Sequence, residues 1–291
     1  MDPAIDASLV SVESVSDSLS STGYLPDAAI ATIVFLAARL NKPLLVEGPA
    51  GVGKTELARS LAAMTGRQLI RLQCYEGVDE SKVLYEWNYR KQLLRIQAEQ
   101  GQNWDQLSGD IFSEEFLLER PVLQAVRSDA PTVLLIDEID KLDMEAEALL
   151  LEVLSEWQVT IPEMGTMRAV TTPLVILTSN DSRELSEALK RRCLYLHLDY
   201  PDLEREKAIV LQRVPELPET LAEQIVKVVQ SIRELELKKA PSIAETLDWA
   251  RTLLHLNVTT LDPETLQRTL SVLLKFRSDL SRAEQHLDLG D

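Results

Sequence analysis

The amino-acid sequence predicts an α/β fold in three layers, with a parallel sheet packed between helices, followed by a small all-α domain. Three apolar runs, at residues 44–46, 133–136 and 174–177, show no polar alternation, which is typical of strands buried on both faces of a parallel sheet. A glycine-rich loop and a helical pattern follow the first run. After residue 200 the hydrophobic spacing is helical throughout, so a separate helical domain is expected there.

The length of 291 residues allows a large core and favours two domains. We expect a flexible tail over residues 1–21, because Ser, Asp and Ala dominate there without sustained periodicity. The α/β domain is predicted over 22–200, with an insertion near 78–112 and a hairpin near 158–172. The helical domain is predicted over 201–291.

Composition and charge narrow the class of protein. Hydrophobic residues make up 45% of the sequence and charged residues 26%, as in ordinary soluble proteins. The longest apolar run, Ala28–Leu40, is too short to cross a bilayer, and Asp2 and Asp6 stand where a secretory signal would carry basic residues. A cytoplasmic protein without a membrane span is therefore expected. The net charge of −17 opposes binding to nucleic acid, because neutralising a phosphate backbone needs clustered Lys and Arg.

Residues that often bind transition metals are scattered in this sequence. Cys74 and Cys193 lie far apart and outside any C-x-x-C spacing, so neither a disulfide nor a metal site is expected, and both are predicted to be small buried residues. His197, His255 and His286 form no ligand spacing. We expect these histidines to be structural or surface residues.

The loop after the first apolar run has the pattern G-x-x-x-x-G-K-[ST] between a predicted strand and a predicted helix. Its glycines let successive backbone N–H groups point into one concavity, and the following helix directs the positive end of its dipole there. This geometry holds a polyphosphate. Lys54 would contact the β- and γ-phosphates, and the Thr55 hydroxyl would bind Mg²⁺. The residues expected to line the nucleotide site are Gly48, Pro49, Ala50, Gly51, Val52, Gly53, Lys54, Thr55 and Glu56.

Two carboxylates end the second apolar run, at Asp137 and Glu138. In an open parallel sheet, ligands bind at the carboxyl ends of the strands, so this pair is expected beside the phosphate loop. Asp137 would hold Mg²⁺ mainly through its water shell, and Glu138 would polarise an attacking water. The pair is therefore predicted to serve hydrolysis.

A polar residue also follows the third apolar run. Asn180 is expected at the same sheet edge, where it could orient the attacking water or contact the γ-phosphate. A short predicted helix then ends in Lys190, Arg191 and Arg192. Basic residues are common at the end of a helix, where the dipole favours positive charge, so these residues can have a structural or a functional role.

The insertion concentrates aromatic residues in a sequence that is only 5% aromatic. Tyr85, Trp87 and Tyr89 alternate, so they are expected on one face of a strand, whereas Leu93, Leu94 and Ile96 favour a helix. Two readings stay open for this segment. Its apolar residues either pack inside the protein or form an exposed surface for a partner.

With the loop, the acidic pair, the polar strand end, the paired arginines and the helical domain in this order, the sequence resembles AAA+ ATPases, which have a P-loop NTPase fold, from about Pro26 onward. The insertion and the hairpin before Asn180 resemble the MoxR-like branch. The segments 85–89 and 241–249 are similar to its CoxD-like members. The resemblance implies a cytoplasmic, ATP- and Mg²⁺-dependent hexameric ring, a homo-oligomer that acts as a chaperone on a protein client.

In CoxD-like proteins the implied client is a molybdenum hydroxylase of the carbon monoxide dehydrogenase type, and a von Willebrand A domain protein is the usual partner. The resemblance makes Asn180 the first sensor and Arg192 an arginine finger directed at a neighbouring subunit, with Arg191 as the competing candidate. No basic residue lies in Ser242–Glu245, where family members usually carry an arginine. A nucleotide-gated scaffold with little ATPase activity is therefore the alternative function.

Overall fold

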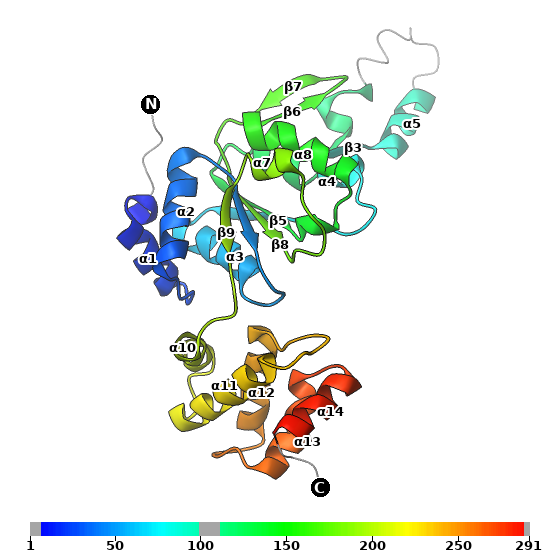
Figure 1. Ribbon diagram of the computed structural model, residues 1–291. Coiled ribbons are helices and arrows are strands. Elements are labelled where there is room, and N and C mark those ends of the chain that lie inside the picture. Colours follow the sequence, from blue (N-terminus) through cyan, green and yellow to red (C-terminus); the bar gives the residue numbers. More distant parts are fainter. Residues whose placement is uncertain (1–6, 99–110, 288–291) are drawn as a thin grey trace. The chain divides into compact units, whose positions relative to one another are not determined.

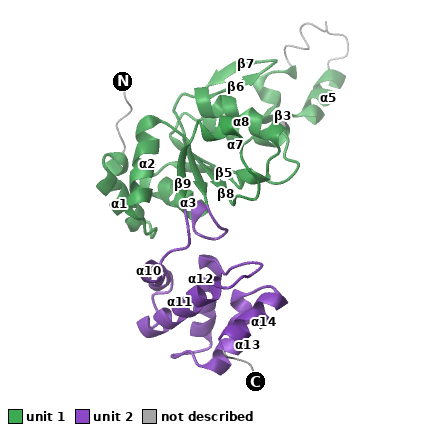
Figure 2. Cartoon of the chain, viewed as in Figure 1, with its two compact units in different colours: residues 1–47, 55–197 green, residues 48–54, 198–291 purple. Residues whose placement is uncertain are grey.

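The computed structural model describes residues 7–98 and 111–287 (Figure 1). The chain forms two compact units, one of residues 1–47 and 55–197 and the other of residues 48–54 and 198–291 (Figure 2). Each unit has its own hydrophobic core. No helix in the described ranges combines the length and the apolar character that crossing a bilayer requires.

The first unit is built on a five-stranded parallel sheet with the order β2-β5-β8-β1-β9. Its strands are β1 (Leu44–Glu47), β2 (Gln68–Gln73), β5 (Thr132–Asp137), β8 (Leu174–Ser179) and β9 (Leu194–His197). All residues of β5 are buried, because the strand is central and carries helices on its faces. The predicted parallel sheet is confirmed.

Helices flank this sheet (Figure 1). Among them, α2 contacts β1 and β9, and α7 contacts β2 and β5. The longer helices of this unit include α2 (Ala28–Leu40), α3 (Lys54–Thr65), α5 (Tyr89–Ala98), α7 (Pro121–Arg127) and α8 (Met144–Glu156). A shorter helix, α9 (Glu187–Lys190), precedes β9.

The flexible tail expected over residues 1–21 is wrong for the part that the structure describes. Residues 7–9 form a 3₁₀ turn, and α1 spans Val12–Ser21. Ser11 caps α1, accepting a hydrogen bond from Ser14 N at 3.1 Å, while Ser11 N donates to Ser14 Oγ at 2.9 Å. Val15 and Leu19, four residues apart, are fully buried, and α1 contacts α2. Two buried apolar residues on one face thus stabilise α1, although its serine-rich composition does not predict a helix.

The predicted insertion contains α4 (Glu80–Val83), β3 (Tyr85–Trp87) and α5, and its residues 99–110 lie outside the described ranges. β3 pairs antiparallel with β4 (Leu117–Glu119). Trp87 is buried and packs edge-on against Tyr85 and Phe112.

The expectation that Tyr89 shares a strand face with Tyr85 and Trp87 is wrong. The Asn88 side chain accepts a hydrogen bond from Lys91 N at 3.1 Å, which ends the strand and begins α5. Tyr89, Leu93 and Leu94 are exposed on α5, as a helix but not a buried strand allows.

Residues 158–172, where a hairpin was expected, hold β6 (Gln158–Ile161) and β7 (Gly165–Arg168), paired antiparallel. Gly165 has a φ of +85°, which favours glycine at the turn. The outer side of β6 and β7 carries exposed polar residues, and Val159 and Ile161 point into the core.

The second unit is helical after Leu198, as predicted. Its helices are α10 (Leu203–Arg213), α11 (Glu219–Arg233), α12 (Ile243–His255), α13 (Pro263–Leu273) and α14 (Arg277–His286). Trp249 is fully buried at the centre of their core, and its Nε1 donates to Thr269 Oγ1 at 2.8 Å. The hydroxyl therefore satisfies the one polar atom of the largest buried side chain in this helical core.

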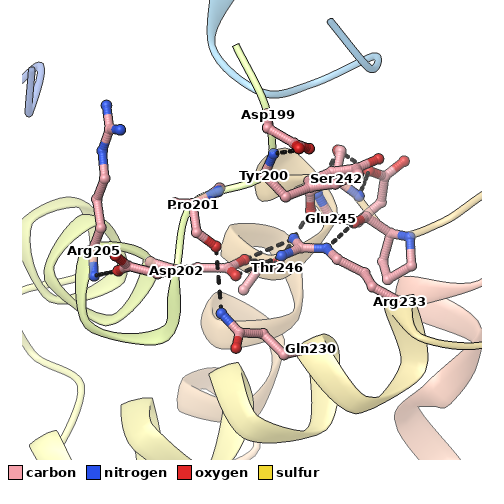
Figure 3. Close-up of polar contacts among 12 residues, drawn as sticks. Asp199, Tyr200, Pro201, Asp202, Arg205, Gln230, Arg233, Ser242, Glu245 and Thr246 are labelled. Atoms are coloured by element: carbon pink, nitrogen blue, oxygen red, sulfur yellow. Dashed lines mark hydrogen bonds and ion pairs between the residues drawn. The ribbon is translucent and has the colours of Figure 1, made fainter. Parts of the chain in front are cut away.

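Arg233 joins three segments of the second unit (Figure 3). Its guanidinium donates to both carboxylate oxygens of Glu206 at 2.6 and 2.8 Å, and its Nε donates to the Pro241 carbonyl at 2.8 Å. The same guanidinium lies 4.3 Å from the centre of the Tyr200 ring. Thr246 Oγ1 also donates to Glu206, at 3.0 Å. This buried network fixes the start of α12 to α10, α11 and the segment that leads into α10.

Candidate functional site

The glycine-rich loop curls tightly between β1 and α3. Gly48, Gly51 and Gly53 have φ values of +151°, +77° and +100°, which side chains with a Cβ rarely adopt. Lys54 Nζ donates to the carbonyls of Gly48 and Pro49 at 2.6 and 2.7 Å. The ammonium group thus lies within the concavity of the loop, where the sequence places a phosphate-binding charge.

Two glycines of the loop also permit close contacts inside the second unit. A Cβ at Gly48 would lie 1.9 Å from the carbonyl oxygen of Leu198. A Cβ at Gly51 would lie 2.3 Å from the Cβ of Ser242, the residue before α12. Neither position accepts a larger residue without a shift of the backbone.

Ser242 begins the stretch in which the family resemblance predicted an arginine. Its amide donates to Glu245 Oε2 at 3.0 Å and its hydroxyl accepts from Glu245 N, which forms a capping box (Figure 3). Lys239 Nζ lies 3.1 Å from Glu245 Oε1. Burial alone would raise the pKa of Glu245, but hydrogen bonds from Ser242 and Lys239 lower it below its usual value. A helix cap therefore occupies this place.

Asp137 is the last residue of β5 and its side chain is 4% exposed. Its Oδ1 accepts hydrogen bonds from Thr55 Oγ1 at 2.9 Å and from Thr178 Oγ1 at 2.6 Å. Thr55 lies in the first turn of α3, and Thr178 lies on β8, the strand next to β5. The hydroxyl and the carboxylate that the sequence assigns to Mg²⁺ are thus in direct contact.

The second oxygen of Asp137 has a partner that sequence reasoning missed. Arg71 donates to Oδ2 from Nε at 3.1 Å and from a terminal nitrogen at 2.5 Å. Arg71 also donates to Gln73 Oε1. Both residues lie on β2, the edge strand beside β5, where Gln73 is opposite Asp137. Their alternation with the buried Ile70 and Leu72 is the signal that could have found them.

Glu138 has a left-handed backbone, with φ 58° and ψ 51°. A non-glycine residue in this conformation costs roughly 1–3 kcal/mol and persists only where its surroundings hold it. Here Glu138 N donates to Thr178 Oγ1 at 2.9 Å, and Gln73 Nε2 donates to Glu138 Oε2 at 3.3 Å. These contacts hold Glu138 directly after Asp137 at the carboxyl edge of the sheet.

Asn180 follows β8, so it also lies at the carboxyl edge of the sheet. Its backbone amide donates to Asp140 Oδ1 at 3.3 Å, and Ser182 N donates to Asp140 Oδ2 at 3.1 Å. Burial alone would raise the pKa of Asp140, yet these hydrogen bonds and one from the Ser182 hydroxyl lower it below its usual value. Asp140, which the sequence did not single out, fixes the loop that carries Asn180.

The paired arginines are bonded to α8 and α9 rather than to the strand-end carboxylates. Arg192 donates to Ser155 Oγ and, at 2.7 Å, to the Ala188 carbonyl. The side chain of Arg191 is 79% exposed and lies 3.1 Å from Glu187, one helical turn earlier. Arg191 is thus the outward residue of the pair, and Arg192 is held within its own chain.

Both cysteines are free thiols, as predicted. Burial and the neighbouring carboxylates of Asp137, Asp140 and Glu138 raise the pKa of Cys74 to about 12. Burial also raises the pKa of Cys193 to about 12. These thiols therefore stay protonated at neutral pH. Cys74 is buried, as predicted, whereas Cys193 is only partly buried.

The residues at the end of β5 fit magnesium. Thr55 and Asp137 offer only oxygen donors, which Mg²⁺ prefers, and Mg²⁺ is usually held by one or two carboxylates together with substrate phosphates. Within residues 7–98 and 111–287, no group of three or more His, Cys, Asp or Glu side chains is placed to bind a metal. Glu56, also predicted near the nucleotide, lies in the first turn of α3, with one carboxylate oxygen 3.9 Å from Arg59.

Comparison with curated proteins finds relatives of similar extent. An uncharacterised protein of Staphylococcus aureus (strain bovine RF122 / ET3-1), SAB1265c, is 29% identical over 223 residues, which cover 75% of this chain and 77% of the relative. Another, SH1500 of Staphylococcus haemolyticus, is 29% identical over 224 residues, which cover 75% of this chain and 78% of the relative.

Solved structures that resemble the chain include two of Thermotoga maritima RuvB. One, of a mutant, has a TM-score of 0.49 at 19% identity and covers 84% of this chain and 69% of that one. The other, described as a Holliday junction branch migration motor, has a TM-score of 0.49 at 15% identity, with 90% and 72% covered. Such scores carry no argument about function.

A family model gives the stronger result. The model of the AAA domain in its dynein-related subfamily matches residues 43–193, which is more than half of the chain and includes the loop, β5, β8 and the paired arginines. The chain belongs to the AAA domain family, in its dynein-related subfamily.

Proposed function

We propose that this AAA protein binds ATP with Mg²⁺ and hydrolyses it. The observation that carries the proposal is the contact of Thr55 and Thr178 with one oxygen of Asp137, directly before the strained Glu138. The hydrogen bonds of Asp137 with Thr55 and Thr178 do not require a second carboxylate at residue 138. A second carboxylate held in a costly backbone conformation beside it favours a catalytic role.

Each residue has a role that follows from its position. Lys54 would exchange the carbonyls of Gly48 and Pro49 for phosphate oxygens. Bound Mg²⁺ would neutralise phosphate charge, held by Thr55 directly and by Asp137 through water. Glu138 would accept a proton from the attacking water.

Asn180 would orient the same water, because it ends the strand adjacent to β5. Asp140 holds its loop by accepting hydrogen bonds from the backbone amides of Asn180 and Ser182, which keeps Asn180 at the carboxyl edge of the sheet. This assignment predicts that Asn180 affects the rate of hydrolysis more than the affinity for ATP.

The proposal extends to an assembled ring that remodels a protein client. An arginine from a neighbouring subunit would stabilise transition-state charge, and such arginines are worth about 10³-fold or more in rate. The exposed side chain of Arg191 supports it as the candidate that reaches outward, whereas Arg192 would have to leave Ser155 and Ala188.

We further propose that the chain acts as a MoxR-like chaperone similar to CoxD-like proteins. The client would be a metalloenzyme of the molybdenum hydroxylase type, and the partner a von Willebrand A domain protein. The β6–β7 hairpin and the insertion with its exposed α5 support this branch, as features that the resemblance associates with it. Co-purification of the chain with such a partner, in the presence of ATP, tests it.

A second candidate function is a nucleotide-gated scaffold with little turnover. It is favoured by the capping box at Ser242 and Glu245, since an acidic residue lies where an arginine would respond to ATP. Phosphate release by the purified protein, with and without candidate partners, separates the two. Persistent inactivity despite tight ATP binding would favour the scaffold.

The hydrolytic proposal is tested with Glu138→Gln, which keeps the size of the side chain but cannot accept a proton. We expect ATP binding within about twofold of the wild type and phosphate release slower by about 100-fold or more. Glu145→Gln, the same change at an exposed position on α8, is the matched control and should match the wild type. Undiminished turnover in Glu138→Gln would contradict the assignment.

A further inference from the structure

The guanidinium of Arg71 lies on the same carboxylate to which the proposed function assigns magnesium. Asp137 uses Oδ1 for Thr55 and Thr178 and Oδ2 for Arg71, so each oxygen has a different kind of partner. The hydroxyls are neutral. Arg71 is therefore the cation that compensates the buried charge of Asp137.

A cation in this place is required by electrostatics. A carboxylate that is 4% exposed loses most of its hydration, and an uncompensated buried charge is costly. A hydrated Mg²⁺ ion would supply the same compensation, and two cations would repel each other at one carboxylate oxygen. Arg71 and magnesium are thus competitors for the negative charge of Asp137.

The position of Arg71 allows its side chain to leave Asp137. It belongs to the edge strand of the sheet, and its side chain is 43% exposed, so the guanidinium can turn into water at small cost. Arg233, in the helical unit, donates to both carboxylate oxygens of Glu206, and its side chain is only 8% exposed. The greater exposure of Arg71 means that the Arg71–Asp137 pair can open toward solvent, whereas the Arg233–Glu206 pair is enclosed.

We propose that Arg71 is the counter-cation of Asp137 in the absence of nucleotide, and that its ion pair with Asp137 opens when magnesium binds with ATP. This inference rests on the proposed function. It makes Arg71 a positioning residue that sets how strongly ATP binding depends on Mg²⁺. It also keeps the empty site stable and its carboxylate in place.

The test measures the dissociation constant of ATP by calorimetry, with saturating Mg²⁺ and with EDTA. Arg71→Met removes the competing charge. The ratio of the dissociation constant in EDTA to that in Mg²⁺ should therefore rise about tenfold, which is the effect of one charge-assisted hydrogen bond. Arg71→Lys keeps a cation and should stay near the wild-type ratio. Arg71→Gln serves as a second neutral variant if Arg71→Met folds poorly.

Arg183→Met is the matched control. Arg183 also contacts a buried carboxylate of the first unit, Glu147, at 2.9 Å, with 30% of its side chain exposed. Its loss should lower the melting temperature equally with and without Mg²⁺ and ATP. Arg71→Met should lower the melting temperature of the empty protein more than that of the liganded protein.

The outcomes are distinct. An unchanged affinity ratio in folded Arg71→Met and Arg71→Gln, or weaker binding of ATP with Mg²⁺, would overturn the role of Arg71 while leaving the proposed function intact. A wild-type protein that binds ATP in neither condition would overturn the proposed function, and the role of Arg71 with it.

Discussion

Two buried carboxylates, one in each unit, pair with arginines that differ in exposure to solvent. Arg233 and Glu206 are 8% and 0% exposed, and the guanidinium also contacts the Pro241 carbonyl and the Tyr200 ring. Arg71 and Asp137 are 43% and 4% exposed, at the open edge of the sheet. The first pair is closed and structural, and the second presents a carboxylate that a ligand can share.

The difference follows from where the fold places each carboxylate. Asp137 receives its hydrogen bonds from β2, α3 and β8, three elements that meet at the carboxyl edge of the sheet. Glu206 lies inside a helical core, where no sheet edge exists to admit a ligand. The fold, more than the residue types, decides which pair is available for chemistry.

The largest expected effect is on the closed pair. Glu206→Gln leaves the buried guanidinium of Arg233 without its counter-charge, so the free energy of unfolding should fall by about 3–5 kcal/mol. Urea unfolding followed by circular dichroism measures it. A loss below about 1 kcal/mol would show that Arg233 finds another partner or water, and that the two pairs do not differ as described.

The matched change in the open pair should cost less stability but more function. Asp137→Asn keeps an oxygen for Thr55 and Thr178, and Arg71 can turn to solvent, so a loss of about 1 kcal/mol is expected. Mg²⁺ should then no longer strengthen ATP binding. Titration of ATP with and without Mg²⁺ checks this, and an unaltered Mg²⁺ effect would show that Asp137 does not take part in binding the ion.

The smallest effect concerns Asp140, a buried carboxylate held by neutral donors. Its pKa is lowered in the folded protein, so its stabilisation is fully present above its unfolded pKa of about 4 and is lost as pH falls through the folded pKa. The stability difference between wild type and Asp140→Asn should therefore be constant near neutral pH and shrink below about pH 4. Urea unfolding across this range measures the difference, and a gap that widens toward acid would contradict the sign.

Sequence reasoning located the parts of the site that local patterns specify. The loop from Gly48 to Thr55 and the acids at Asp137 and Glu138 follow from motifs at strand ends, and the parallel sheet brings the strand ends together. Arg71 and Gln73 could not be assigned in this way. Their roles depend on β2 lying beside β5, a pairing between strands about sixty residues apart.

The misassigned segments have local causes. A serine capping box at Ser11 and two buried residues form α1 where composition indicated a tail, and the Asn88 cap turns a predicted strand into α5 at Tyr89. In both places a side-chain cap at the first turn begins a helix that the composition or the alternation of the surrounding residues does not indicate. The capping box at Ser242 likewise replaces the expected arginine with a purely local interaction.

ATP hydrolysis is assigned to the edge of the sheet at Asp137 and Glu138. The most direct measurement is steady-state phosphate release from ATP by the wild type and by Glu138→Gln, each with and without Mg²⁺. We predict Mg²⁺-dependent release by the wild type alone. Release that is equal in the two proteins, or that does not depend on Mg²⁺, would contradict the account.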